Sequence, residues 1–368
     1  MSLKLPTAQR RGFLAGILEA ALAPHPVDTY LQLFDPMLTW RDLRAKVVGV
    51  QRRTDRTVTL TLQPTRQWNG HLAGQFIQLS TVIDGVRHSR CFSPANAADG
   101  GNGHIELTVT AHPDGFVSRH LRENIVVGDV LGLSPADGSF TLPEKIGGQV
   151  VFVSGGSGIT PVLSMLRTLI ATEYTGSVTF VHYARTPDDV PYAAELSVID
   201  AAYPNIDVSL RYTDVPGGEF FSPEHLDGIA GLSADADDPA QIFLCGPAPL
   251  MDDVKTYCAE RDLTDRLHFE AFTISTPTVD PNEPVTGELS FTRSSTTAAN
   301  DGRTILEQAE AAGLSPESGC RMGICFSCTA IKKSGCTRNV LTGETDTEAD
   351  KHIQLCISQP VGDVEIEV

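Results

Sequence analysis

Four cysteines toward the C-terminal end constrain most strongly what this chain can fold into. Three of them lie in the run Cys320-Arg-Met-Gly-Ile-Cys325-Phe-Ser-Cys328, and the fourth, Cys356, follows after twenty-seven further residues. The pattern C-x4-C-x2-C with a distant fourth cysteine is the ligand spacing of a plant-type [2Fe-2S] cluster, in which four thiolates hold two irons. The sequence therefore predicts an electron-transfer centre with these four cysteines as its metal ligands.

The residues around the cysteines suit a loop that wraps tightly around a cluster. Gly319 and Gly323 can reach backbone angles that other residues avoid. A structural zinc site or space-filling thiols are the alternatives, but zinc ligands usually come as two close pairs, whereas Cys356 stands alone. The other four cysteines fit no second metal spacing; they are Cys91, Cys245, Cys258 and Cys336.

Length and composition indicate an ordinary multi-domain globular chain. Its 368 residues are enough for two or three domains, and 41% hydrophobic with 20% charged residues is typical of soluble proteins. No apolar run reaches the eighteen or so residues of a membrane span. The net charge of −18 argues against a nucleic-acid partner. Cysteines explained by a cluster rather than by disulfides favour a reducing compartment, and we expect a cytoplasmic protein.

The N-terminal part leaves two questions open. Residues 9–16 resemble a twin-arginine export signal, but the segment 13–22 also fits an amphipathic helix. Residues 1–68 carry a formal net charge of +5, and residues 285–368 carry a formal net charge of −5. Such a basic end can meet its own cluster domain, a protein partner or the inner face of an anionic membrane, although a plain solvated surface explains it equally well.

Hydrophobic patterns divide the chain into three domains. Alternating segments at 46–62, 75–82 and 104–110, separated by turn residues, predict an antiparallel β-barrel. From residue 148 on, buried strands at 150–153, 178–182 and 242–244 alternate with helices, which predicts an α/β domain with a parallel sheet. A proline-rich stretch at 276–284 favours an extended connector. Beyond it we expect a strand at 288–292, a helix at 304–312, the cysteine loop and a closing strand at 364–368.

Two short motifs on the predicted barrel resemble those of the ferredoxin–NADP reductase superfamily. Arg90-Cys91-Phe92-Ser93 is similar to its R-x-[FY]-S signature, and the run from Gly115 through Val117 and Ser118 is similar to its second flavin motif. The resemblance implies that Arg90 pairs with the FAD diphosphate, Phe92 packs on the isoalloxazine, and Ser93 lies beside the nitrogen that receives hydride. Guanidinium forks match phosphate oxygens, and a helix N-terminus offers N–H groups to an anion.

Motifs of the α/β domain complete the resemblance. Gly155-Gly156-Ser-Gly158-Ile-Thr160-Pro161 looks like the loop with which this superfamily holds NAD(P)H, and Cys245-Gly246-Pro247 like the motif beside the nicotinamide. Glu270 and Phe272 match the region that touches the flavin from the other side. Arg185 follows the second strand and can meet a 2′-phosphate, which favours NADPH over NADH, although Asp188 and Asp189 stand nearby.

The resemblance orders the chain as a three-cofactor oxidoreductase. We expect an N-terminal helical extension at 1–40, an FAD-binding β-barrel at 41–145, an α/β NAD(P)H-binding domain at 146–273, a linker at 274–284 and an α+β, β-grasp ferredoxin domain at 285–368. Ser93, Cys245 and Glu270 are the expected catalytic residues. Electrons would pass from NADPH through FAD to the [2Fe-2S] cluster, because a flavin can link a two-electron donor to a one-electron acceptor.

The acceptor has to be another protein. The N-terminal extension makes the chain look most like actinobacterial reductases that serve membrane acyl-CoA desaturases. A soluble multicomponent oxygenase or epoxidase is the alternative acceptor. A redox sensor or a structural electron-transfer subunit is the alternative from another class, although such subunits have a shorter cluster segment than the one that ends at Cys356.

Overall fold

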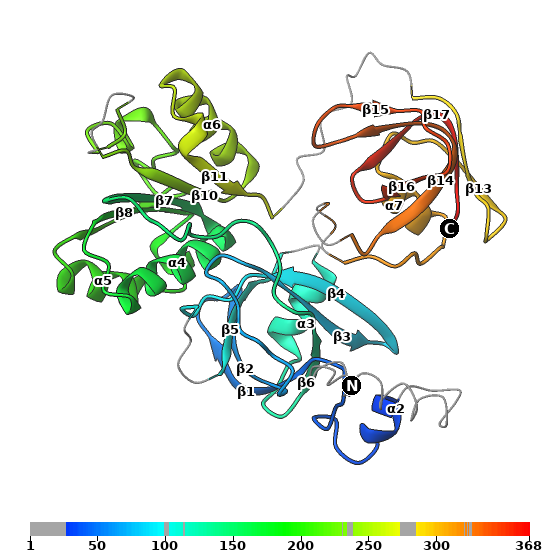
Figure 1. The fold of residues 1–368 in the computed structure, drawn as a ribbon, viewed down its shortest axis with the longest axis horizontal. Coiled ribbons are helices and arrows are strands. Elements are labelled where there is room, and N and C mark those ends of the chain that lie inside the picture. The colour runs from blue at the N-terminus through cyan, green and yellow to red at the C-terminus, as the bar shows by residue number, and fades with distance from the viewer. Residues whose placement is uncertain are drawn as a thin grey trace, which may run out of the picture.

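The computed structural model describes residues 27–98, 103–112, 115–229, 231–233, 238–272, 285–319, 321, 323 and 326–368. They form three bodies, each built on its own sheet (Figure 1). The twin-arginine motif, the helix expected at 13–22 and the connector at 274–284 lie outside these residues. In the part that is described, no helix combines the length and apolar character needed to cross a bilayer. A short helix, α2 (Val27–Leu31), precedes the first body.

The first body is a six-stranded antiparallel sheet in the order β4-β3-β6-β1-β2-β5. Its strands are β1 (Arg44–Arg52), β2 (Thr57–Pro64), β3 (Ile77–Ile83), β4 (Val86–Phe92), β5 (Ile105–Thr110) and β6 (Val130–Leu133). The edge strands meet just beyond β4, where Pro94 pairs with Leu107, so the sheet curls into the predicted barrel. Helix α3 (Phe116–Glu123) packs Val117 and Leu121 into the barrel core.

The second body is a five-stranded parallel sheet in the order β11-β10-β7-β8-β9. Its strands are β7 (Gln149–Gly155), β8 (Ser177–Ala184), β9 (Ile206–Tyr212), β10 (Gln241–Cys245) and β11 (Leu267–Glu270). Helices α4 (Ile159–Ala171) and α5 (Ala193–Ala202) contribute to the core on one face, and α6 (Ala248–Glu260) to the core on the other. The central strand β7 is buried on both faces, as its continuous apolar run predicts.

The third body is a mixed sheet in the order β13-β12-β17-β14-β15, with β16 also paired to β14. Its strands are β12 (Glu288–Phe291), β13 (Thr296–Ala299), β14 (Thr329–Asn339), β15 (Thr345–Asp346), β16 (Lys351–Gln354) and β17 (Ser358–Ile366). Helix α7 (Ile305–Ala311) begins with the capping box Thr304/Glu307 and ends before Gly313, whose φ is +83°. The closing strand is longer than expected and lies inside the sheet, parallel to β12.

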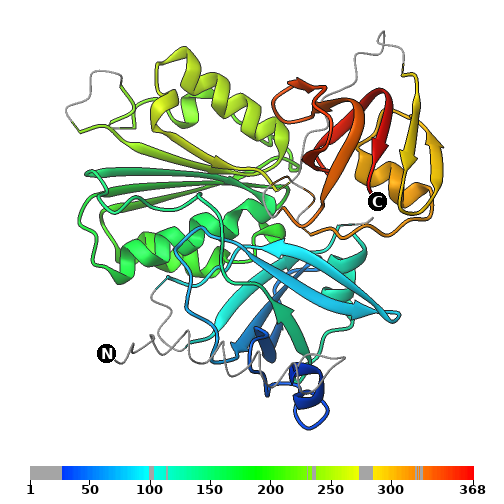
Figure 2. The same ribbon diagram turned by 45° about the vertical axis from the view of Figure 1, so that its right-hand side comes forward.

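The barrel contacts both of the other bodies (Figure 2). Arg167 of α4 donates to the carbonyl of Ala95 at 2.7 Å and to the carboxylate of Glu106 at 2.8 Å, which ties the barrel to the parallel sheet. On its other side, Gln78 of β3 donates to the hydroxyl of Ser327 at 3.3 Å. Ser327 lies between the predicted cluster ligands Cys325 and Cys328.

Candidate functional site

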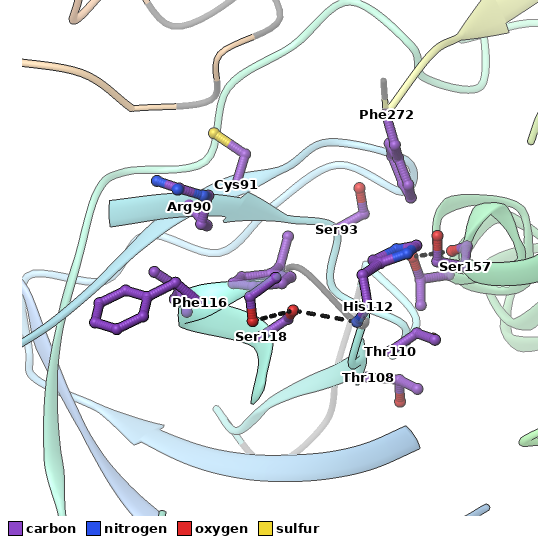
Figure 3. A pocket seen from close by; sticks show the side chains of 14 residues that line it. Arg90, Cys91, Ser93, Thr108, Thr110, His112, Phe116, Ser118, Ser157 and Phe272 are labelled. Carbon is purple, nitrogen blue, oxygen red and sulfur yellow. Dashed lines mark hydrogen bonds between the residues drawn. The ribbon is translucent and has the colours of Figure 1, made fainter. Parts of the chain in front are cut away.

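A pocket of about 300 Å³ lies where the barrel meets the parallel sheet (Figure 3). Its wall combines the end of β4, the end of β5, the start of α3, the loop before α4 and Phe272. The lining residues are Arg90, Cys91, Phe92, Ser93, Thr108, Thr110, His112, Gly115, Phe116, Val117, Ser118, Ser157, Thr160 and Phe272. The fold therefore brings the two barrel motifs together with parts of the nucleotide domain.

Two polar side chains in this wall lack partners that would satisfy them fully. Ser93 is 3% exposed, and its hydroxyl makes no hydrogen bond within the described residues. Arg90 forms no ion pair with any described carboxylate; its Nη1 donates to the carbonyl of Ser89 at 2.7 Å. Burial lowers the pKa of Arg90, as does neighbouring Arg321, while Glu310 partly offsets them. A buried donor and a desolvated cation suit a bound anionic group with hydrogen-bond acceptors.

The start of α3 forms a second part of the pocket wall. Gly115 precedes the helix, and no side chain caps its first N–H groups. Ser118 instead accepts from the backbone of His112 at 3.4 Å and donates to the carbonyl of Gly115 at 3.3 Å. A Cβ at position 115 would stand 2.3 Å from the Ser118 hydroxyl, so a larger residue would force this hydroxyl to rotate away from its two partners. The helix thus offers its positive end to an anion in the pocket.

The glycine loop and the Cys245 motif meet at the carboxyl edge of the parallel sheet. The chain leaves β7 toward β8 and leaves β10 toward β11, on opposite sides, so a crevice opens between β7 and β10. A Cβ on Gly158 would lie 2.1 Å from the carbonyl oxygen of Cys245, and one on Gly155 2.8 Å from Pro247. The close approach of the two loops explains why both motifs need glycine here, and the edge where they meet is the place at which such sheets bind ligands.

Four polar residues line up in register across this edge of the sheet. Glu270 pairs with Cys245, Cys245 with Ser154, and Ser154 with His182. Burial raises the pKa of the Cys245 thiol well above its usual value, with Glu270 adding to the effect, so the thiol is neutral. Burial raises the pKa of Glu270 to about 8, and its Oε2 has no hydrogen-bond partner among the described residues.

His182 belongs to the same row and was not anticipated from the sequence. Its side chain is fully buried, and its Nδ1 lies 2.9 Å from the Ser154 hydroxyl. Burial lowers its pKa to about 4, so the imidazole is neutral at physiological pH. In the sequence, a histidine inside an apolar strand looks the same whether it belongs to a polar row at a site or only packs in the core.

The structure describes half of the predicted cluster site. Cys328 and Cys356 are 3% and 4% exposed and share one core, where the carbonyl of Cys328 accepts from Leu355 at 3.0 Å. Gln354 donates to the carbonyl of Gly323 at 2.7 Å, and φ of Gly323 is +77°. Cys320 and Cys325 lie outside the described residues. Both placed cysteines are therefore buried in the same core, and their role as cluster ligands stays a prediction.

The remaining expected site residues fall into two groups. Gly155, Gly156, Gly158, Pro161, Gly246 and Pro247 lie at the crevice rather than in the pocket wall. Arg185 lies just beyond β8 with its side chain 53% exposed, and it pairs with Asp189 at 2.9 Å. Sequence reasoning missed the pocket residues Thr108, Thr110, His112, Phe116 and Ser157. The two threonines share a strand face, which the period-2 pattern of residues 104–110 could have shown.

The arrangement fits one class of protein, an NAD(P)H-dependent flavin and iron–sulfur oxidoreductase. Family models agree with it along the chain. The oxidoreductase FAD-binding domain matches residues 50–142, the oxidoreductase NAD-binding domain residues 152–256, and the 2Fe-2S iron-sulfur cluster binding domain residues 291–361.

Similar proteins and a similar solved structure support the same class. The NADPH oxidoreductase of Mycobacterium tuberculosis is 32% identical over 347 residues, which are 93% of this chain and 88% of that protein. The glycine betaine monooxygenase reductase subunit of Pseudomonas aeruginosa is 28% identical over 80% of this chain and 86% of its own. The structure of phthalate dioxygenase reductase superposes with a TM-score of 0.63 at 24% identity, covering 89% of this chain and 98% of that one. The chain belongs to the ferredoxin–NADP reductase superfamily, in the branch that carries a C-terminal [2Fe-2S] domain.

Proposed function

We propose that this oxidoreductase takes electrons from NADPH and delivers them through FAD and the [2Fe-2S] cluster to a partner oxygenase, namely a membrane acyl-CoA desaturase. The observation that carries the proposal is the presence of three cofactor domains in one chain. The described residues, which include two of the four predicted cluster ligands, contain no group of three or more His, Cys, Asp or Glu that could hold a metal. Relatives named as monooxygenase reductase subunits support an oxygenase as the acceptor.

The N-terminal extension supports the desaturase within this class. The match to the Mycobacterium tuberculosis protein covers 93% of the chain, so it must reach into residues 1–40, whereas the match to the glycine betaine monooxygenase reductase subunit covers 80%. An element shared with an actinobacterial relative and lying outside the three cofactor domains is suited to recognise a particular acceptor.

In this proposal the site residues act around bound cofactors. Bound FAD would supply the link between a two-electron hydride donor and a one-electron iron–sulfur cluster. Arg90 and the start of α3 would hold the diphosphate, and Ser93 and Phe272, which line the same pocket, would contact the flavin ring. Cys245 would meet the nicotinamide as an uncharged thiol, and Glu270, protonated at neutral pH, would hold a proton beside it in the sheet register.

Reconstitution tests the acceptor. The purified holoprotein is mixed with NADPH and membranes that contain an acyl-CoA desaturase from the same organism, and fatty-acid products are measured. We expect unsaturated product that depends on the reductase and disappears with Cys325→Ser, which removes a cluster ligand. If a soluble oxygenase forms product with this reductase while the desaturase forms none, the soluble oxygenase is the acceptor.

Arg185 tests the choice of NADPH over NADH. A 2′-phosphate would compete with Asp189 for the guanidinium, which is largely exposed and therefore free to exchange partners. We expect Arg185→Met to lower kcat/KM for NADPH about tenfold, equivalent to about 1.4 kcal/mol, with little effect on NADH. Asp189→Asn serves as the matched variant and should raise the preference for NADPH. Equal losses with both nucleotides would remove Arg185 from the proposal.

A further inference from the structure

A short segment at the start of the described chain exposes apolar side chains. Within eight residues, Leu33 is 78% exposed, Phe34 88%, Leu38 49% and Trp40 47%. Single exposed apolar residues are ordinary, but a cluster of them marks a surface that binds something. In both views this segment, α2 with the loop that follows, projects from the end of the barrel remote from the nucleotide domain (Figures 1 and 2).

The exposure is not the result of a loosely attached loop. Asp28 is 5% exposed, and its carboxylate accepts from the backbone of Trp40 and, at 2.8 Å each, from Arg41 and Asp42. Burial alone would raise the pKa of Asp28, but these N–H groups hold it below its usual value. Gln67 of the barrel also donates to the carbonyl of Thr39 at 2.9 Å. The loop is therefore fixed in a shape that presents its apolar side chains outward.

The charge around this segment is opposite to that of the whole chain. Residues 31–46 carry three basic side chains against two acidic ones, a balance of +1, whereas the chain as a whole carries −18. Arg44 pairs with Asp42 at 2.7 Å, which leaves Arg41 and Lys46 against Asp35. Arg41 follows Trp40 directly, and Arg66 precedes the Gln67 that holds the loop; both arginines are exposed, as is Lys46. Basic side chains beside exposed Trp, Phe and Leu are the combination that binds an anionic lipid surface.

We propose that residues 31–41 form a peripheral membrane-binding surface that inserts Leu33, Phe34, Leu38 and Trp40 into the headgroup region of an anionic bilayer. Tryptophan favours the water–lipid interface, and arginine pairs with lipid phosphates. The flavin pocket is lined by no residue of this segment, so a bilayer bound here leaves it open. The inference deepens the proposed function, because a reductase of a membrane enzyme works at a bilayer surface.

Vesicle co-sedimentation of the full-length holoprotein tests the surface without any desaturase. Vesicles of phosphatidylcholine with 30% phosphatidylglycerol, about the composition of an anionic leaflet, are compared with pure phosphatidylcholine. We expect binding to the anionic vesicles, weakened by salt, and a loss of about tenfold or more for Phe34→Asp. The matched control is Phe220→Asp, which alters a phenylalanine 73% exposed on the nucleotide domain and should bind like the parent.

Several outcomes would overturn the inference. The parent could fail to bind anionic vesicles, or Phe34→Asp could bind them as well as the parent does. A lower melting temperature of Phe34→Asp with unchanged vesicle binding would show that the side chain packs against another part of the chain, and a changed sedimentation-equilibrium mass would show a second copy there. Vesicle binding that succeeds while desaturase reconstitution fails would leave this surface intact and refute only the proposed acceptor.

Discussion

Glu270 shows how one buried carboxyl group makes stability depend on pH. It lies in register beside Cys245 with one oxygen unpartnered among the described residues, and burial raises its pKa from 4.5 to about 8. Below about pH 4.5 both folded and unfolded chains are protonated here, and the protonated form is the one that the fold accommodates. As the pH rises toward 8 the unfolded chain releases this proton and the folded chain keeps it, so stability falls.

The first prediction concerns Glu270→Gln, which keeps the shape of the side chain without its titration. We expect the difference in melting temperature, variant minus parent, to be larger at pH 9 than at pH 5. Each kcal/mol of unfolding free energy that the variant gains over the parent corresponds to about 2–4 °C. Thermal unfolding at both pH values measures it. Glu344→Gln, at an exposed position, is the control and should show no such trend. A parallel pH profile for Glu270→Gln and the parent would contradict the assigned burial.

At the residue scale, the sequence predicted the site residues that belong to a recognisable motif. It did not predict the residues that reach the same site only because the chain folds. Arg90, Ser93 and Gly115 come together in the pocket wall with Phe272, as the motifs predict. Their roles toward FAD stay predictions. Ser157 and His182 were missed, because a single serine or histidine means the same in a sequence whether it faces a ligand, water or the core.

Among the elements, α4 carries the contact that fixes the barrel against the parallel sheet. Arg167 pairs with Glu195 at 2.6 Å within its own domain and with Glu106 of β5 across the boundary. Burial opposes the charge of Arg167, but the two carboxylates outweigh it and raise its pKa above the usual value. Tyr192 adds a hydrogen bond to Glu106 at 3.0 Å. The pocket of Figure 3 lies between the two bodies that these charged residues hold together.

The second prediction is that Arg167→Met destabilises the pair of domains. The substitution leaves the partly buried carboxylates of Glu106 and Glu195 without their cation, which lowers the free energy of unfolding by about 3 kcal/mol. Denaturant unfolding, monitored by flavin fluorescence, measures the loss. Arg293→Met is the control, since Arg293 is 71% exposed in its pair with Glu367 and should cost less than about 1 kcal/mol. Equal effects of the two substitutions would show that the cluster does not stabilise the boundary.

Elements were predictable where their pattern was strong. The alternation of β1, β2, β3 and β5, the apolar runs of β7, β8 and β10, and the capped helix α7 were all expected and are present. Strand β4 was missed because it forms a pocket wall and buries no regular face. Strands β9 and β11 are the edges of their sheet, and β11 has four residues. Neither strand was predicted. Strand β11 is too short to show a pattern, whereas the alternating Ile206, Val208, Leu210 and Tyr212 of β9 could have been recognised.

For the molecule as a whole, the decisive contact is the one between the barrel and the cluster loop. Gln78 reaches Ser327 from β3, and it lies opposite Cys91 of the flavin motif in the β3–β4 register. The hydrogen bond therefore joins a strand pair of the flavin pocket to the loop between two predicted ligands of the cluster. No sequence pattern announces this contact, because 249 residues separate the two side chains.

The third prediction is that Gln78→Leu slows electron transfer from flavin to cluster about two- to tenfold, as the loss of a hydrogen bond worth about 0.5–1.5 kcal/mol implies. Stopped-flow absorbance after mixing with NADPH separates the two steps, and flavin reduction should keep its rate. Ser327→Ala should match Gln78→Leu, and Ser80→Ala on the same strand should behave like the parent. If cluster reduction keeps its rate in both contact variants, the hydrogen bond does not position the loop.

The place of β17 in the third sheet has a consequence for how the protein matures in the cell. This strand lies between β12 and β14, so the earlier strands of the domain have no central partner until residue 366 has left the ribosome. The barrel and the parallel sheet are complete about a hundred residues sooner and can fold during synthesis. Insertion of iron and sulfide should therefore come late, on a chain whose first two domains are already folded.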